Sequence, residues 1–121
     1  PAVTITSDAA NPQSGAFTAS FTFSEAVTGF VIGDITVGNG AATNFQTTSA
    51  SVYTATITPA ADGAVTIDVG ADVATDAVTN NNTAATQLSV TNDQTKPTII
   101  ITSDAASPQS GAFTATFTFS E

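Results

Sequence analysis

The stretch ITSDAANPQSGAFTASFTFSE at residues 5–25 decides the fold of this protein, and it returns as ITSDAASPQSGAFTATFTFSE at residues 101–121. Residues 1–25 align with residues 97–121 without a gap, and 20 of the 25 positions are identical. A constant offset of 96 residues indicates tandem units of domain size. We therefore expect a complete unit at residues 1–96, with a linker at 91–96, and the first two strands of an incomplete second unit at 97–121. The five differing pairs are Ala2/Thr98, Val3/Ile99, Thr4/Ile100, Asn11/Ser107 and Ser20/Thr116.

Within this stretch, apolar and polar residues alternate with a period of two, which predicts a β-strand with one buried face. Phe17, Phe21 and Phe23 share one parity, whereas Thr18 and Thr22 share the other. Threonine suits a half-exposed strand surface because its β-branched side chain fits the pleat. The phenylalanines are therefore predicted to form the core. The same alternation occurs at residues 3–6, 53–58, 65–69 and 87–90.

Two features between these strands predict changes of chain direction. Phe30 and Ile32 share a parity, but Ile35 takes the opposite one, so Gly33-Asp34 predicts a bulge or a change of sheet. The sequence VGNG at residues 37–40 contains Asn-Gly, which is typical of a tight hairpin.

The spacing of strands and turns predicts an all-β protein. About seven short strands within 96 residues, with no helical stripe of useful length, indicate an immunoglobulin-like β-sandwich. The cysteines and the tryptophan of antibody domains are absent, so this prediction rests on the number and spacing of the strands.

The composition excludes several classes of function. The net charge is -9 and Lys96 is the only cationic side chain, so binding to nucleic acid or to anionic membrane surfaces is not expected. No apolar run reaches the length of a membrane span. Histidine and cysteine are also absent, and no cleft is indicated around the carboxylates, so we expect no catalytic residues and no enzyme activity. The short, weakly charged polar side chains favour an extracellular location.

Four phrases together resemble the bacterial Ig-like repeats of very large secreted or surface-anchored adhesins, including those with RTX-type export. They are FTFSEAVTGF (21–30), GDITVGNG (33–40), YTATITPAADGAVTIDV (53–69) and VATDAVTNNNTAA (73–85). The family often has DAAGN where this chain has DAVTN at 76–80, so a glycine turn is less expected there. The resemblance implies an extracellular spacer on the bacterial cell surface that carries a distal binding module. It also implies calcium at the junctions between repeats.

The expected strand order suggests which residues would hold such a calcium ion. It places the Glu25 turn and the 72–82 loop at the end near the incoming linker, and Asp93 at the other end. Calcium takes about six to eight oxygen ligands. The alternative is that these are solvated turn residues, because Asp and Asn favour turns. The candidate ligands are Asp93 and Glu121 at the junction, and Glu25, Asp76, Asn80 and Asn82 as the matching set in the first unit.

Two functions follow for residues 97–121. In the first, the chain is a non-catalytic spacer that contacts neighbouring copies of the same repeat, and residues 97–121 begin the next copy. In the second, the chain is the subunit of an extracellular filament, and residues 97–121 add strands to another chain. In both cases Phe113, Phe117 and Phe119 require a cover, because two isolated strands are not stable in water.

Overall fold

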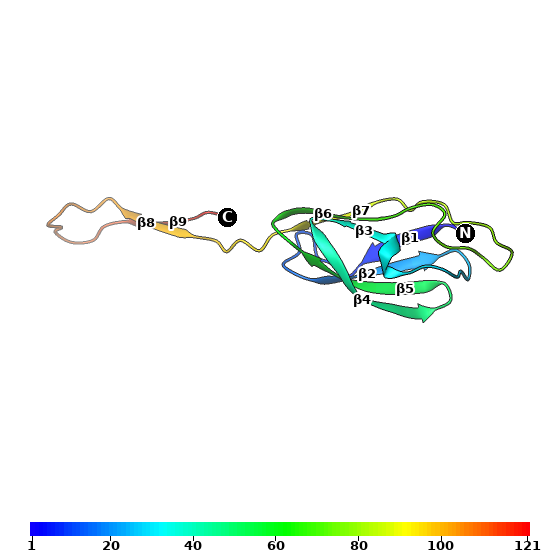
Figure 1. Cartoon of the computed structure of the whole chain (residues 1–121). Helices are drawn as coiled ribbons and strands as arrows, with labels where there is room; N and C mark the ends of the chain where they lie inside the picture. The colour runs from blue at the N-terminus through cyan, green and yellow to red at the C-terminus, as the bar shows by residue number, and fades with distance from the viewer.

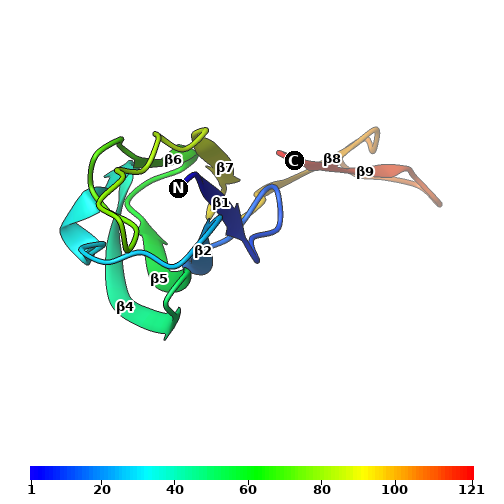
Figure 2. The ribbon, with the colours of Figure 1, turned by 90° about the vertical axis from the view of Figure 1, so that its right-hand side faces the viewer.

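The computed structural model describes all 121 residues and contains a β-sandwich followed by a separate two-stranded hairpin (Figure 1). One sheet has the order β1-β2-β5-β4 and the other has the order β3-β6-β7. Figure 2 shows these two layers from the end of the molecule. The first sheet contains β1 (Val3–Ser7), β2 (Phe17–Phe23), β5 (Val52–Pro59) and β4 (Gly40–Ser49). The second contains β3 (Ile35–Gly38), β6 (Gly63–Val69) and β7 (Leu88–Asn92), and the hairpin consists of β8 (Ile99–Ser103) and β9 (Ala115–Phe119).

The alternating sequence produces the core of the sandwich. In β2, the residues at Phe17, Ala19, Phe21 and Phe23 are buried, and the residues between them lie outside. The apolar residues of facing strands meet in register: Phe21 pairs with Ile5 of β1 on one side and with Tyr53 of β5 on the other. The predicted all-β sandwich and the predicted phenylalanine core are confirmed. Seventeen buried residues make up this core.

An aromatic cluster forms part of the core. Phe30 is its centre, with ring centroids 5.1 Å from Phe23, 5.2 Å from Tyr53 and 5.7 Å from Phe21 and Phe45. The edge-to-face geometry of most of these pairs adds about 0.5–1.5 kcal/mol per pair to the burial itself. The Tyr53 hydroxyl donates a hydrogen bond to the Val27 carbonyl at 3.2 Å, so its polar atom is satisfied inside the cluster.

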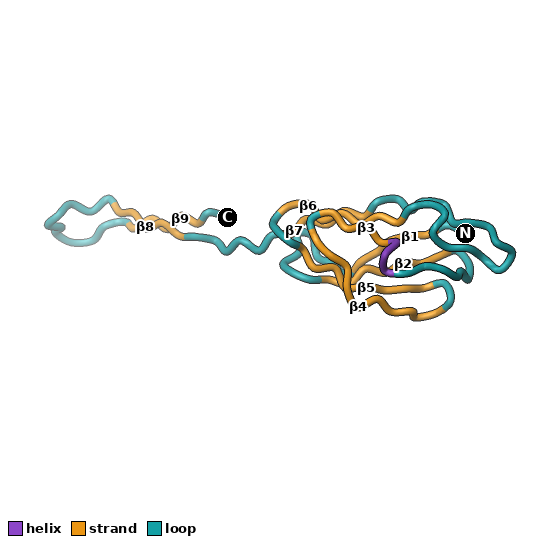
Figure 3. Tube along the Cα trace, viewed as in Figure 1, coloured by secondary structure: helices purple, strands orange, loops and turns teal.

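The parity change at Gly33-Asp34 marks a change of sheet, as expected. The connection from β2 in the first sheet to β3 in the second sheet ends in a single 3₁₀ turn, η1 (Ile32–Asp34) (Figure 3). Asp34 fixes this turn, because its Oδ2 accepts a 2.9 Å hydrogen bond from the Val31 amide.

The tight hairpin predicted at VGNG is wrong. β3 pairs with β6, and β4 pairs with β5, so residues 37–40 carry the chain from one sheet to the other instead of folding it back. The two glycines let the backbone pass close to the neighbouring strands. A Cβ on Gly40 would lie 2.7 Å from the Thr58 carbonyl oxygen, and a Cβ on Gly38 would collide with the Thr66 side chain. Asn39 supplies the positive φ, at 57°, that turns the chain between them.

The chain enters and leaves the sandwich at opposite ends. Pro1 lies beside the 72–83 loop, since the Thr83 amide donates to the Pro1 carbonyl. Strand β7 ends at the opposite pole, and the hairpin continues outward from there (Figure 1). Residues 91 and 92, which we expected in the linker, form the last part of β7. The structure has no helix that is long and apolar enough to span a membrane.

Candidate functional site

The hairpin β8–β9 carries the largest exposed apolar surface of the molecule. Phe113, Phe117 and Phe119 are 56–59% exposed, and Ile99 and Ile101 are 46% and 63% exposed. Their equivalents 96 positions earlier, from Val3 to Phe23, are at most 7% exposed. Each of these side chains exposes about half of its surface, so together they present roughly 500 Å² of apolar area. Isolated surface of this size is typical of an interaction site.

The hairpin has the same internal geometry as β1–β2. Ile101 pairs with Phe117 as Ile5 pairs with Phe21. The remaining pairs of β8 and β9 are likewise the pairs of β1 and β2 with both residue numbers raised by 96. The side-chain hydrogen bonds repeat as well. Asp104 Oδ1 accepts from the Thr114 amide at 2.8 Å, as Asp8 does from the Thr18 amide. The hairpin is therefore shaped like the part of the sandwich that β1 and β2 supply.

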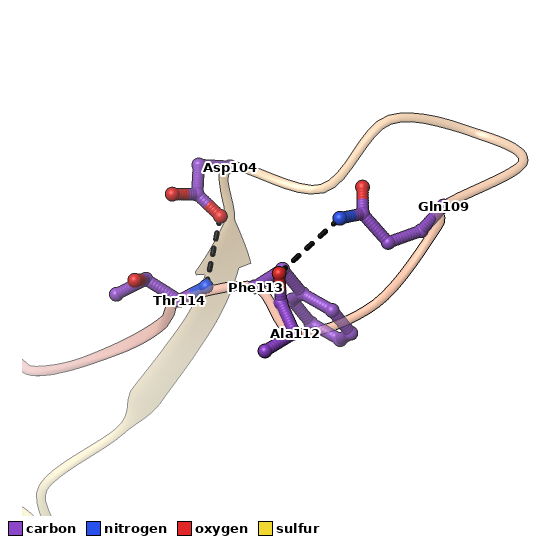
Figure 4. Close-up of a pocket in the computed structure, with 5 residues that line it drawn as sticks. All are labelled: Asp104, Gln109, Ala112, Phe113 and Thr114. Carbon is purple, nitrogen blue, oxygen red and sulfur yellow. Dashed lines mark hydrogen bonds between the residues drawn. The ribbon is translucent and has the colours of Figure 1, made fainter.

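A hollow of about 320 Å³ lies in the loop of the hairpin (Figure 4). Asp104, Gln109, Ala112, Phe113 and Thr114 line it. In the sandwich, the equivalent loop receives the end of β7. The Gln13 amide donates to the Thr91 carbonyl at 2.8 Å, and the Gln13 carbonyl accepts from the Asp93 amide at 2.9 Å. One lining residue of the hollow, Gln109, is thus the equivalent of the residue that pairs with the end of β7 in the sandwich.

A family model of the bacterial Ig-like domain matches residues 1–91. The chain belongs to this family. No curated protein and no solved structure matches the chain. Bacterial Ig-like domains are structural, typically non-enzymatic modules that are often surface-exposed, which agrees with the structural, non-catalytic class of function that the sequence predicts.

The Ig-like domain places the predicted calcium residues at the two expected ends. Glu25, Asp76, Asn80 and Asn82 belong to the pole of the N-terminus. Glu25 Oε1 lies 3.4 Å from the Pro1 nitrogen. Asp76 and Asn80 contact each other, since Asn80 Nδ2 donates to Asp76 Oδ2 at 2.8 Å. That bond, together with the Asn80 amide, lowers the pKa of the Asp76 carboxyl below its ordinary value.

Asn82 has a structural role that its sequence context does not reveal. It is 2% exposed, and its Oδ1 accepts hydrogen bonds from the Val73 and Ala74 amides at 2.9 and 2.8 Å. Its Nδ2 donates to the carbonyls of Gly70 and Thr83. The amide group of Asn82 therefore holds the 70–83 loop of the Ig-like domain together, and both lone pairs of its oxygen are used.

Asp93 lies in the linker and Glu121 at the end of the hairpin, both at the pole opposite the N-terminus. Asp93 Oδ1 accepts a 3.1 Å hydrogen bond from the Thr95 amide. Glu121 follows Ser120, whose amide donates to the Thr98 carbonyl, so the end of the hairpin returns to the linker. No group of three or more carboxylates in the structure is placed to hold a metal ion. The calcium assignment stays a prediction for the six residues, and the side-chain oxygen of Asn82 would have to give up its two backbone hydrogen bonds to take part.

One carboxylate outside the predicted calcium set also contacts the linker. Asp62, in the turn between β5 and β6, accepts hydrogen bonds from the Thr95 hydroxyl and from the Gln94 amide, and these bonds lower the pKa of its carboxyl. The turn sequence PAADG gives no signal of this contact, because its partners lie more than 30 positions away.

Proposed function

We propose that this chain is a spacer of a large extracellular bacterial adhesin or surface fibre. Its Ig-like domains follow one another end to end and hold a distal binding module away from the cell. The observation that carries this proposal is the position of the hairpin. Residues 97–121 leave from the pole opposite the N-terminus and repeat β1–β2 in sequence and register.

The energetics favour a second unit as the cover of the hairpin. Covering about 500 Å² of apolar surface contributes roughly 12 kcal/mol before the cost of ordering. In the first unit, β6 and β7 cover the equivalent surface, with Val65, Ile67 and Val90 all 5% exposed or less. Residues with the sequence of 26–96 are therefore the matching cover.

The test is a chain in which a copy of residues 26–96 follows Glu121. We expect the backbone amides of β8 and β9 to become as protected from hydrogen exchange as those of β1 and β2. We also expect the monomer to lengthen by one unit in small-angle scattering. If the amides of β8 and β9 stay unprotected, residues 97–121 do not begin a second unit and the proposal fails.

The second candidate is a filament in which residues 97–121 enter the sandwich of another copy. Their near identity with residues 1–25 favours it, because either hairpin fits the same receiving face, residues 26–96. That face already holds residues 1–25, so each exchange covers one hairpin and exposes another. The net burial is about zero while association costs entropy, so exchange requires copies that have lost residues 1–25. We expect the full chain to show no head-to-tail polymers by size-exclusion chromatography, and a chain of residues 26–121 to form them.

We further propose that calcium binds at the junction of two complete units, with Asp93 and Glu121 among its ligands. Asp and Glu oxygens are the ligands that calcium prefers. Thermal melting of the two-unit chain, first in millimolar calcium and then in chelator, tests this proposal. An ion that binds only the folded state raises the Tm. The assignment is refuted if the Tm is equal in both conditions. It is also refuted if the calcium-dependent rise in Tm persists in the double variant Asp93→Asn, Glu121→Gln.

A further inference from the structure

The last two residues of β7 and the residue that follows them are held on both sides. On one side, the backbone of Gln13 bonds to Thr91 and Asp93. On the other side, Asn92, which is 1% exposed, donates from Nδ2 to the Ala61 carbonyl at 2.9 Å and accepts at Oδ1 from the Gly15 amide at 3.2 Å. The chain therefore leaves β7 between two turns that fix its position.

Asp62 extends this hold by two further residues. Its Oδ1 accepts a 2.7 Å hydrogen bond from the Gln94 amide, and its Oδ2 accepts from the Thr95 hydroxyl. Hydrogen bonds to an ionised carboxylate are stronger than those between neutral groups. The Thr95 amide is also engaged, because it donates to Asp93 Oδ1. The bonds of Gln94 and Thr95 to Asp62 thus join residues 32 and 33 positions apart in the chain, and the linker is ordered up to Thr95.

The free part of the linker is consequently very short. The next hydrogen bond along the chain is that of the Thr98 amide, which donates to Ser120 Oγ within the hairpin. Only Lys96 and Pro97 lie between the two held parts, and the ring of Pro97 fixes its own φ. Lys96 precedes this proline and is therefore confined to extended conformations, so the joint permits fewer relative orientations than an unrestricted linker of the same length.

We propose that Asp62 is the positioning residue that sets the direction in which the chain leaves one unit and enters the next. The inference rests on the proposed spacer function and deepens it, because it gives the row of domains a stiffness that comes from the linker itself. Each unit then holds the first residues of its outgoing linker, and the direction of the following unit is set before any contact between the two domains.

The test measures the linker directly in the full chain. The protein has no cysteine, so nitroxide labels attach only at introduced sites. Labels at Thr48→Cys, on the exposed side of β4, and at Lys96→Cys report the distance from the sandwich to the joint by pulsed electron paramagnetic resonance. We expect a narrow distribution in the parent chain and at least a twofold broader one after Asp62→Ala or after Thr95→Val, which removes the hydroxyl and keeps the shape.

Asp68→Ala is the matched control, because it removes the same charge from a residue that bonds to Gln87 and not to the linker. We expect this control to leave the distribution narrow. A second readout is hydrogen exchange: the Gln94 amide should exchange at least tenfold faster in Asp62→Ala, while the amides of β2 and β5 stay protected. Unchanged widths and unchanged Gln94 exchange would overturn the role of Asp62, and they would leave the two-unit test of the spacer proposal unaffected.

Discussion

Phe21 and Phe117 are the same residue of the repeat in two different surroundings, and they allow a matched test of the packing argument. Phe21 is 0% exposed and lies against Phe30, whereas Phe117 is 58% exposed. Phe21→Ala removes a fully buried ring and leaves a cavity, so it should lower the free energy of unfolding by about 3–5 kcal/mol. Phe117→Ala removes a ring that the sandwich does not contact, so its effect should stay within about 0.5 kcal/mol.

Urea unfolding followed by tyrosine fluorescence measures both variants, because Tyr53 is the only tyrosine and lies in the core. A domain of this size has a stability of roughly 5–15 kcal/mol, so Phe21→Ala could leave too little folded protein. The milder pair Phe21→Leu and Phe117→Leu then replaces it, with the same expected order. Equal losses at the two positions would show that the hairpin is packed in solution, and the assignment of its face as uncovered would be wrong.

Three further measurements follow from the structure. Asn82→Ala should cost about 2–4 kcal/mol in urea unfolding, because it leaves buried amides without partners, whereas Asn81→Ala, with no side-chain hydrogen bond, should cost less than about 0.5 kcal/mol. The pKa of Asp62, followed by carboxyl NMR, should rise towards 3.8 in Thr95→Val. Since the folded-state pKa lies below 3.8, the bonds of Asp62 stabilise the fold above that pH, and this contribution is lost as the pH falls through the lowered pKa. The exposed hairpin face should bind a hydrophobic dye and make the chain associate at high concentration. Phe117→Thr should reduce both effects, as measured by dye fluorescence and by analytical ultracentrifugation. Dye binding and association that are unchanged in this variant would contradict the prediction.

The faces of the strands could be predicted from sequence because burial in a sandwich follows the period of two directly. The prediction was weakest where the alternation fails. Strand β4 has few large apolar residues, and its pairing with β5 shifts register between Thr43 and Gln46, beside Asn44 with φ 50°. An edge strand with such an irregularity has no sequence pattern to mark it.

The candidate sites depend on contacts between residues far apart in the sequence, and these contacts were harder to predict. The sequence Asn-Gly at residues 39–40 is compatible with a tight hairpin and with a crossing between sheets. Only the pairing of β3 with β6 distinguishes the two structures. Asn82 and Asn92 are polar residues in loop-like sequence, yet both are buried with their amides bonded to backbone. The exposed face of the hairpin, in contrast, was foreseeable, because the repeat identifies what covers the same residues in the first unit.

The opposite positions of the two ends of the sandwich determine how it carries mechanical load. A pull on Pro1 and on Lys96 acts along β1 and β7, which run lengthwise and belong to different sheets (Figure 1). The hydrogen bonds of β1 with β2, and of β7 with β6, are then sheared together instead of being opened one after another. Rupture must break a whole row of these hydrogen bonds at once, so a load in this direction meets the greatest resistance that the two sheets can offer, as the proposed spacer role requires.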